Sequence, residues 1–131
     1  MKTVAVLDDD QALIELYQTV LEEEGYAVHA VPISKHLSQV LAKINAAHPD
    51  ILILDIHIPG LNSFDVVKSI QTNPETAKLK VLVCSASRPS LTTLQEMLTK
   101  DGLTAPLVLE KPFDLDELSE TISAMFGKNQ F

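Results

Sequence analysis

The sequence has little cysteine and little positive charge, and both shortages narrow the class of protein. Its 131 residues include one cysteine, Cys84, so an internal disulfide is excluded and a reducing compartment is favoured. Ten lysine and arginine residues stand against 18 aspartate and glutamate residues, for a net charge of −8. Because nucleic-acid phosphates are held by clustered basic side chains, this balance argues against direct binding of nucleic acid. It favours partners that tolerate an acidic surface, and a divalent cation would suit it.

Long apolar runs are also absent. The longest unbroken runs hold four residues, whereas a membrane-spanning helix needs about 20 apolar residues. Met1-Lys2-Thr3 leads directly into an apolar run, which leaves no room for a signal peptide. We therefore expect no membrane association and a cytoplasmic location. With 46% hydrophobic and 21% charged residues, the composition is that of one globular domain.

Short apolar runs alternate with helical patterns over the whole chain. Five runs predict strands: Thr3–Leu7, Ala27–Val31, Ile51–Asp55, Lys80–Ser85 and Leu107–Lys111. Four of them are nearly continuous Val, Ile and Leu, which is typical of a parallel sheet covered on both faces. The second carries a histidine and suggests an edge strand. Each run is followed by apolar residues at helical spacing, within 13–21, 37–44, 64–70, 91–98 and 115–126. This (βα)5 pattern predicts one doubly wound α/β domain over residues 1–131, with no effector domain.

Several residues predict where the helices begin and end. Asp10 is placed to cap the first helix, and Gly25 to end it. Pro89 and Gly102 are placed to start and end the fourth helix. Asp114 opens the fifth helix, three residues before a glutamate, at the spacing of a capping box.

Polar side chains follow the predicted strands at the points where those strands end. Asp8 and Asp9 follow the first strand, Asp55 ends the third, Ser85 ends the fourth and Lys111 ends the fifth. Right-handed crossovers bring the carboxyl ends of parallel strands to one edge of the sheet, where ligands bind in open α/β folds. We therefore expect these five side chains to form a single site.

Three carboxylates at one edge call for a cation. At an effective dielectric near 20, each close pair repels by about 4 kcal/mol, and one lysine cannot neutralise three such groups. Hard oxygen ligands in this number suit Mg²⁺, and Mn²⁺ could substitute. A metal, a carboxylate, a lysine and a small hydroxyl are together the parts needed to receive a phosphoryl group.

Four segments carry a resemblance to a known family. They are Leu7-Asp8-Asp9-Asp10, the stretch from Leu54 to Pro59, Ser85-Ala86 and Lys111-Pro112-Phe113. In this order and spacing they resemble the signatures of the receiver domain of two-component response regulators, over nearly the whole chain. The resemblance implies a flavodoxin-like sheet with strand order 2-1-3-4-5. It also implies a phosphoprotein that takes a phosphoryl group and signals through changed protein contacts, without acting as a turnover enzyme.

The resemblance further implies a role for each acidic residue. Asp55 would be the phosphoacceptor, taking phosphate from a phosphohistidine on a sensor histidine kinase or phosphotransfer protein. Asp9, Asp55 and the main-chain carbonyl of His57 would bind Mg²⁺ directly, and Asp8 would do so through water.

The same resemblance implies roles for the lysine and the hydroxyl. Lys111 would pair with the acceptor carboxylate and then with the phosphoryl oxygens, and a cis Lys111–Pro112 bond would aim it into the site. Ser85 would move inward to bond the phosphate and so couple the chemistry to the face of helix four, strand five and helix five. A downstream protein would meet that face, and the chain could also form a homodimer.

The chain departs from the family pattern at two notable positions. Ser63 stands where the family usually has glycine, so Gly60 or Asn62 is expected to supply the turn. Val108 stands where many relatives place a switching aromatic residue, so the aromatic half of the usual relay is missing. Ser85 keeps the hydroxyl of the more common threonine.

Other functions compete with this one. A pseudo-receiver would keep the fold as an interaction module without switching. A phosphatase acting through an aspartyl phosphate usually places its acid two residues after the nucleophile, where this chain has His57, and it would need a covering domain. A flavodoxin-like redox carrier shares the fold, but the acidic site would repel a flavin phosphate. We expect Cys84 to be a core residue and the other three histidines, His29, His36 and His48, to lie on the surface.

Overall fold

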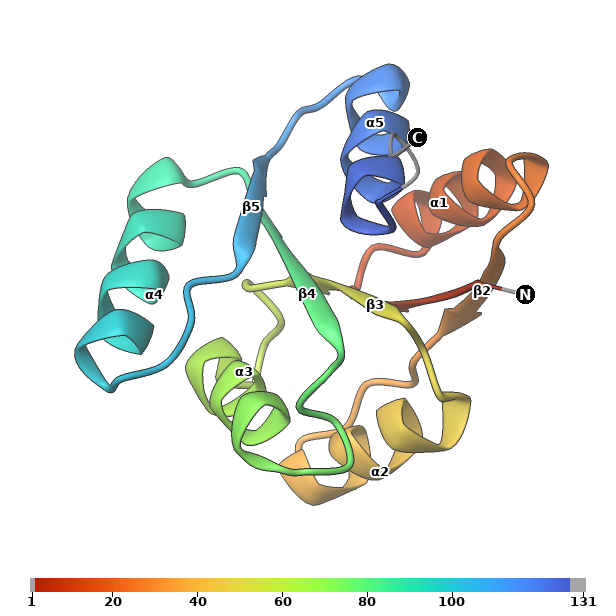
Figure 1. Cartoon of the computed structure of the whole chain (residues 1–131). Helices are drawn as coiled ribbons and strands as arrows, with labels where there is room; N and C mark the ends of the chain where they lie inside the picture. Colours follow the sequence, from red (N-terminus) through yellow and green to blue (C-terminus); the bar gives the residue numbers. More distant parts are fainter. Residues whose placement is uncertain (1, 128–131) are drawn as a thin grey trace.

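The computed structural model describes residues 2–127, which form one parallel sheet flanked by helices (Figure 1). The strands are β1 (Thr3–Leu7), β2 (Ala27–Ala30), β3 (Ile51–Asp55), β4 (Lys80–Ser85) and β5 (Leu107–Glu110). The helices are α1 (Gln11–Glu23), α2 (Leu37–Ala47), α3 (Ser63–Thr72), α4 (Arg88–Lys100) and α5 (Leu115–Met125). The short tail, for which no effector role was expected, continues to residue 131, beyond the described residues.

The strand order is β2-β1-β3-β4-β5, and every neighbouring pair is parallel. Helices α1 and α5 cover one face of the sheet, while α2, α3 and α4 cover the other (Figure 1). The predicted α/β class, the doubly wound sheet and the flavodoxin-like order are therefore confirmed. The weak second strand lies at an edge, as its histidine suggested. Within residues 2–127, no helix is both long and apolar enough to span a bilayer.

Two strands end one residue earlier than predicted. The backbone N–H groups of Val31 and Lys111 still bond to the neighbouring strands, at 2.8 Å from the carbonyl oxygens of Val6 and Ser85. Pro112 follows directly and has no backbone N–H of its own. The Lys111–Pro112 bond is cis, as the resemblance implied.

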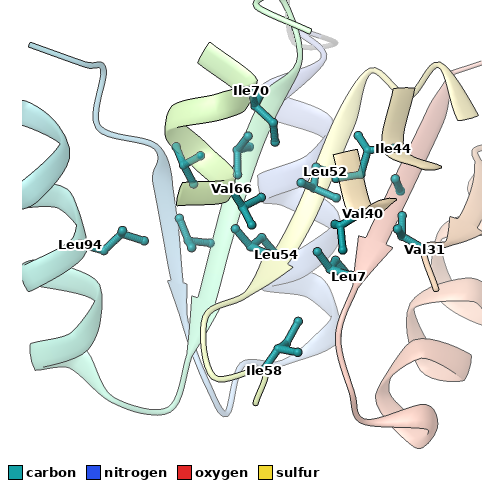
Figure 2. Packing of buried hydrophobic residues seen from close by; sticks show 14 of the residues in the cluster. Leu7, Val31, Val40, Ile44, Leu52, Leu54, Ile58, Val66, Ile70 and Leu94 are labelled. Atoms are coloured by element: carbon teal, nitrogen blue, oxygen red, sulfur yellow. The ribbon is translucent and has the colours of Figure 1, made fainter. Parts of the chain in front are cut away.

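The continuous apolar strands are explained by a core on each face of the sheet. Leu52 and Leu54 of β3 pack toward α2, α3 and α4, and Figure 2 shows them among Val40, Ile44 and Val66. The alternate residues of β3 pack against α1 and α5 on the opposite face. Successive side chains of a strand point to opposite faces, so both sets must be apolar when both faces are covered.

The helix ends agree with the sequence signals. Asp10 accepts the N–H of Leu13 at the start of α1, and Asp114 accepts the N–H of Glu117 at the start of α5. Gly25 and Gly102 follow α1 and α4 with φ of 94° and 78°, a conformation that favours glycine. The caps at Asp10 and Asp114 start α1 and α5 shortly after β1 and β5, so the loops that carry the site residues are short.

Candidate functional site

The acidic cluster is produced by the pairing of β1 with β3. Leu7 lies opposite Leu54 in the parallel register, so the next residues, Asp8 and Asp55, emerge side by side. One carboxylate oxygen each from Asp8, Asp9 and Asp55 lies within 4.8 Å of the others. Asp8 and Asp55 are 3% and 8% exposed, whereas Asp9 is exposed. The site therefore has a buried acidic floor and one carboxylate at its mouth.

The donors around these carboxylates come from three loops. Asp8 Oδ1 accepts the N–H of Asp10 at 2.9 Å, and Asp55 Oδ1 accepts the N–H of His57 at 3.1 Å. Lys111 Nζ lies 3.2 Å from Asp8 Oδ2 and 3.7 Å from Asp55 Oδ2. The lysine thus bridges the two buried carboxylates, as the sequence predicted for one site at the sheet edge.

The electrostatics of the cluster remain unbalanced despite this lysine. Burial raises the pKa of Asp8 above its usual value, and the nearby charge of Asp55 adds to the effect. The N–H of Asp10 and the charge of Lys111 act in the opposite direction but do not cancel it. A carboxylate that is hard to ionise inside an acidic cluster indicates that a further positive charge would be accommodated there.

The donor set fits a hard divalent cation. Three carboxylate oxygens in close range are the ligands that Mg²⁺ and Mn²⁺ prefer, and the exposed mouth at Asp9 leaves room for water ligands. Asp8, Asp9 and Asp55 could hold the ion. His57 is exposed, and its N–H donates to Asp55. The role of its main-chain carbonyl as a metal ligand stays a prediction.

Ser85 is fully buried at the end of β4, which pairs with β3, the strand that ends at Asp55. Its carbonyl oxygen accepts the N–H of Lys111, and its hydroxyl accepts the N–H of Ser87 at 2.9 Å. Ser87 is in turn the N-cap of α4 and accepts the N–H of Ser90 at 3.3 Å. Sequence reasoning did not single out Ser87, although a serine three residues ahead of another at a helix start was an available signal.

An aromatic pair lies near the acidic cluster. Tyr17 of α1 is fully buried and stacks on Phe113, with ring centroids 6.2 Å apart. Burial raises the pKa of Tyr17, and the nearby Cys84 and the charge of Asp8 contribute. Cys84 is fully buried as predicted, and burial raises its pKa to about 12. The pattern of the apolar stripe indicated that Tyr17 belongs to the core, but not that it lies near the acidic site.

In the loop after Asp55, Gly60 and Asn62 have different roles. Gly60 has φ of 80° and makes the left-handed turn. Asn62, with φ of −92°, does not share that role and instead caps α3 by accepting the N–H of Asp65. Ser63 is the first residue of α3 and does not have a positive φ, so the absence of glycine there imposes no strain.

Comparison with known proteins assigns the family. Residues 4–123 match the response regulator receiver domain, and the chain belongs to this family of signalling modules in two-component systems. It is 30% identical over 129 residues to the transcriptional regulatory protein CrdR of Helicobacter pylori, covering 96% of the chain and 55% of CrdR. It is 24% identical over 119 residues to sporulation initiation phosphotransferase F of Bacillus subtilis, covering 91% of the chain and 89% of that protein.

Solved structures agree on the fold. The chemotaxis response regulator CheY4 of Vibrio cholerae superposes with a TM-score of 0.77 at 23% identity, over 95% of this chain and 98% of CheY4. The chain spans about half the length of several curated relatives, among them CrdR and the DNA-binding regulator RpaA of Synechocystis, to which it is 29% identical over 98% of its length.

The first prediction concerns Asp8. Asp8→Asn should raise the metal-free melting temperature by about 3 °C, since it removes like-charge repulsion and a desolvated charge worth on the order of 1 kcal/mol. Because the pKa of Asp8 is raised in the fold, its ionisation opposes folding. The advantage of the variant should therefore shrink as the pH falls through that pKa and the wild-type carboxyl becomes protonated.

Thermal unfolding of Asp8→Asn and Asp10→Asn at several pH values would check this. Asp10 is exposed and asparagine still caps a helix, so Asp10→Asn removes an equal charge with little expected change. A destabilised Asp8→Asn at neutral pH would contradict the account of the cluster.

Proposed function

We propose that this chain accepts a phosphoryl group on Asp55 from a phosphohistidine, in a step that depends on Mg²⁺. One observation carries the proposal: Asp8, Asp9 and Asp55 converge within 4.8 Å while Lys111 Nζ reaches to 3.7 Å from Asp55. Residues 4–123 would act as a single receiver domain, and each chain would take up one phosphoryl group rather than turn over substrate.

The transfer follows from the groups in place. A carboxylate oxygen of Asp55 forms the new P–O bond while the P–N bond of the phosphohistidine breaks and its electron pair returns to the imidazole. Mg²⁺ bound by Asp8, Asp9, Asp55 and the His57 carbonyl would neutralise charge on the transferring oxygens. Lys111 would move its contact from the carboxylate to the phosphoryl oxygens, and Ser85 would donate its hydroxyl to one of them.

The donor would be a sensor histidine kinase or a phosphotransfer protein. Asp9 and Asp10 lie exposed at the mouth of the site, and the first turn of α5 carries Asp116 and Glu117. An approaching protein would meet this negative rim, so we propose that its docking surface carries lysine or arginine around the phosphohistidine.

The output would pass through the face made by α4, β5 and α5, despite the missing aromatic residue. If the Ser85 hydroxyl turns toward a phosphoryl group, it gives up its bond to Ser87, which caps α4. The next residue, Arg88, is bound to Glu110 of β5 at 2.7 Å. These contacts would form a polar path from Asp55 to β5. Val108 has no aromatic ring and so cannot provide the usual aromatic connection. A downstream protein, or a second copy in a homodimer, would read this face.

The acceptor is tested by mass spectrometry of the intact protein after incubation with acetyl phosphate. One phosphoryl adduct should form with Mg²⁺ and disappear when Mg²⁺ is removed or Asp55 is changed to Asn. Asp65→Asn provides a matched control, because Asp65 is an exposed aspartate at the start of α3. An undiminished adduct on Asp55→Asn would refute the assignment, and steady hydrolysis of phosphomonoesters would favour the phosphatase.

The polar path is tested by amide NMR of the protein with and without acetyl phosphate and Mg²⁺. Arg88→Ala should still form the adduct but lose most of the phosphorylation-dependent shifts in β5. Lys68→Ala breaks another exposed ion pair, to Asp101 at 2.8 Å, and should leave those shifts unchanged. A wild-type adduct that shifts no amide of α4 or β5 would instead support the pseudo-receiver.

A further inference from the structure

A hollow of about 510 Å³ lies at the opposite end of the sheet from the acidic cluster. It is bordered by the first residues of β4 and β5, the segments that lead into them, and the last turn of α5. Figure 1 shows β5 as the edge strand of the sheet, with α4 on one side of it and α5 on the other. Because β4 runs from Lys80 to Ser85, roughly 16 Å separates this end from the site. The hollow therefore takes no part in the phosphoryl chemistry.

The lining is apolar with charge of one sign. Leu79, Val81, Pro106, Leu107 and Met125 supply apolar surface. Leu107 is 56% exposed, the most exposed of the large hydrophobic residues that are exposed in the described part of the chain. A size of a few hundred cubic ångströms is typical of sites that receive whole side chains or small ligands.

Only lysines supply charge to this lining. Lys78 and Lys80 are its sole charged residues, in a chain whose net charge is −8. Lys78 and Lys80 also border a second hollow, whose lining includes the acidic residues Asp50 and Glu75. Their carboxylates already accept hydrogen bonds, from the N–H of Thr3 and from the amide of Asn45.

Side-chain hydrogen bonds hold the walls of the hollow in place. The amide of Gln71 on α3 donates to the Thr104 carbonyl at 2.7 Å and accepts the Thr104 N–H at 2.9 Å. Gln95 of α4 donates to the Pro106 carbonyl at 3.2 Å. The ammonium group of Lys80 donates to the Met125 carbonyl at the end of α5. A preformed surface loses little entropy when a ligand binds.

We propose that this hollow, bounded by Lys78–Val81, Thr104–Leu107 and Ala124–Met125, docks a short acidic segment of a partner protein that carries a large apolar side chain. The apolar side chain would cover Leu107 and Met125, and acidic residues flanking it would face Lys78 and Lys80. Charge complementarity selects this occupant, because the remainder of the acidic chain would repel such a segment. The docking would be independent of the phosphorylation state of Asp55.

The test uses amide NMR of the isotope-labelled chain with three synthetic peptides. An acidic pentapeptide, DELFE, should give saturable shifts at residues 78–81 and 104–107. The charge-reversed KKLFK and the apolar-free DESSE should bind at least about tenfold more weakly, since each lacks one half of the proposed recognition. The titrations are run on wild type and on Asp55→Asn. Peptide binding can then be judged even if Asp55 proves not to be the phosphoacceptor.

Two matched pairs of variants locate the binding. Leu107→Ser should weaken DELFE about tenfold, whereas Leu115→Ser, which changes another exposed leucine at the start of α5, should not. Lys78→Ala should weaken it by a smaller, salt-dependent factor, and Lys43→Ala on α2 should have no effect.

Four results would overturn the proposal. The first is equal binding of the three peptides, and the second is binding of DELFE that Leu107→Ser leaves intact. The third is self-association of the wild type that Leu107→Ser abolishes while DELFE fails to compete, because the occupant would then be a second copy of the chain. The fourth is binding of sodium decanoate at these residues without binding of DELFE, because the occupant would then be a small amphipathic acid and not a protein segment.

Discussion

The parallel pairing of β1 with β3 is the constraint on which the site depends. It sets Asp8 beside Asp55 at the edge of a sheet whose two faces are covered, so both carboxylates are buried next to each other. Charge repulsion and desolvation disfavour this buried pair. The packing of β1 and β3 in the two apolar cores holds it in place. Lys111 offsets part of the charge, and the remaining negative charge is the basis for proposing that a cation binds here.

The same arrangement links chemistry to shape. Lys111 and Ser85 are joined through the backbone at the ends of β4 and β5, and the Ser85 hydroxyl holds the first turn of α4 through Ser87. Under the proposed function, a phosphoryl group on Asp55 would compete for Lys111 and for the Ser85 hydroxyl, which hold these strand ends and the start of α4. Membership of the receiver family follows from sequence and fold together, while the switch in this chain would be polar, because Val108 leaves the usual aromatic position without a ring.

Much of this was readable from the sequence, for physical reasons. Strands that are apolar without alternation must be covered on both faces, and carboxylates placed directly after them meet at one edge, so Asp8, Asp9, Asp55 and Lys111 could be brought together in advance. Contacts that depend on side-chain rotation could not be predicted from the sequence. The bond from Ser87 to Ser85, the division of labour between Gly60 and Asn62, and the lysine-lined hollow beside Leu107 require coordinates, since no spacing rule specifies them.

The central claim is that the cluster is an acidic site completed by a divalent cation. Carboxyl carbon NMR of Asp8, followed through a pH titration with and without saturating Mg²⁺, tests it most directly. Without the metal, Asp8 should titrate above its ordinary value of 3.8, because burial opposes its charge. With Mg²⁺ its pKa should fall below the metal-free value, since the cation favours the ionised form. A titration of Asp8 that Mg²⁺ leaves unchanged would contradict the account.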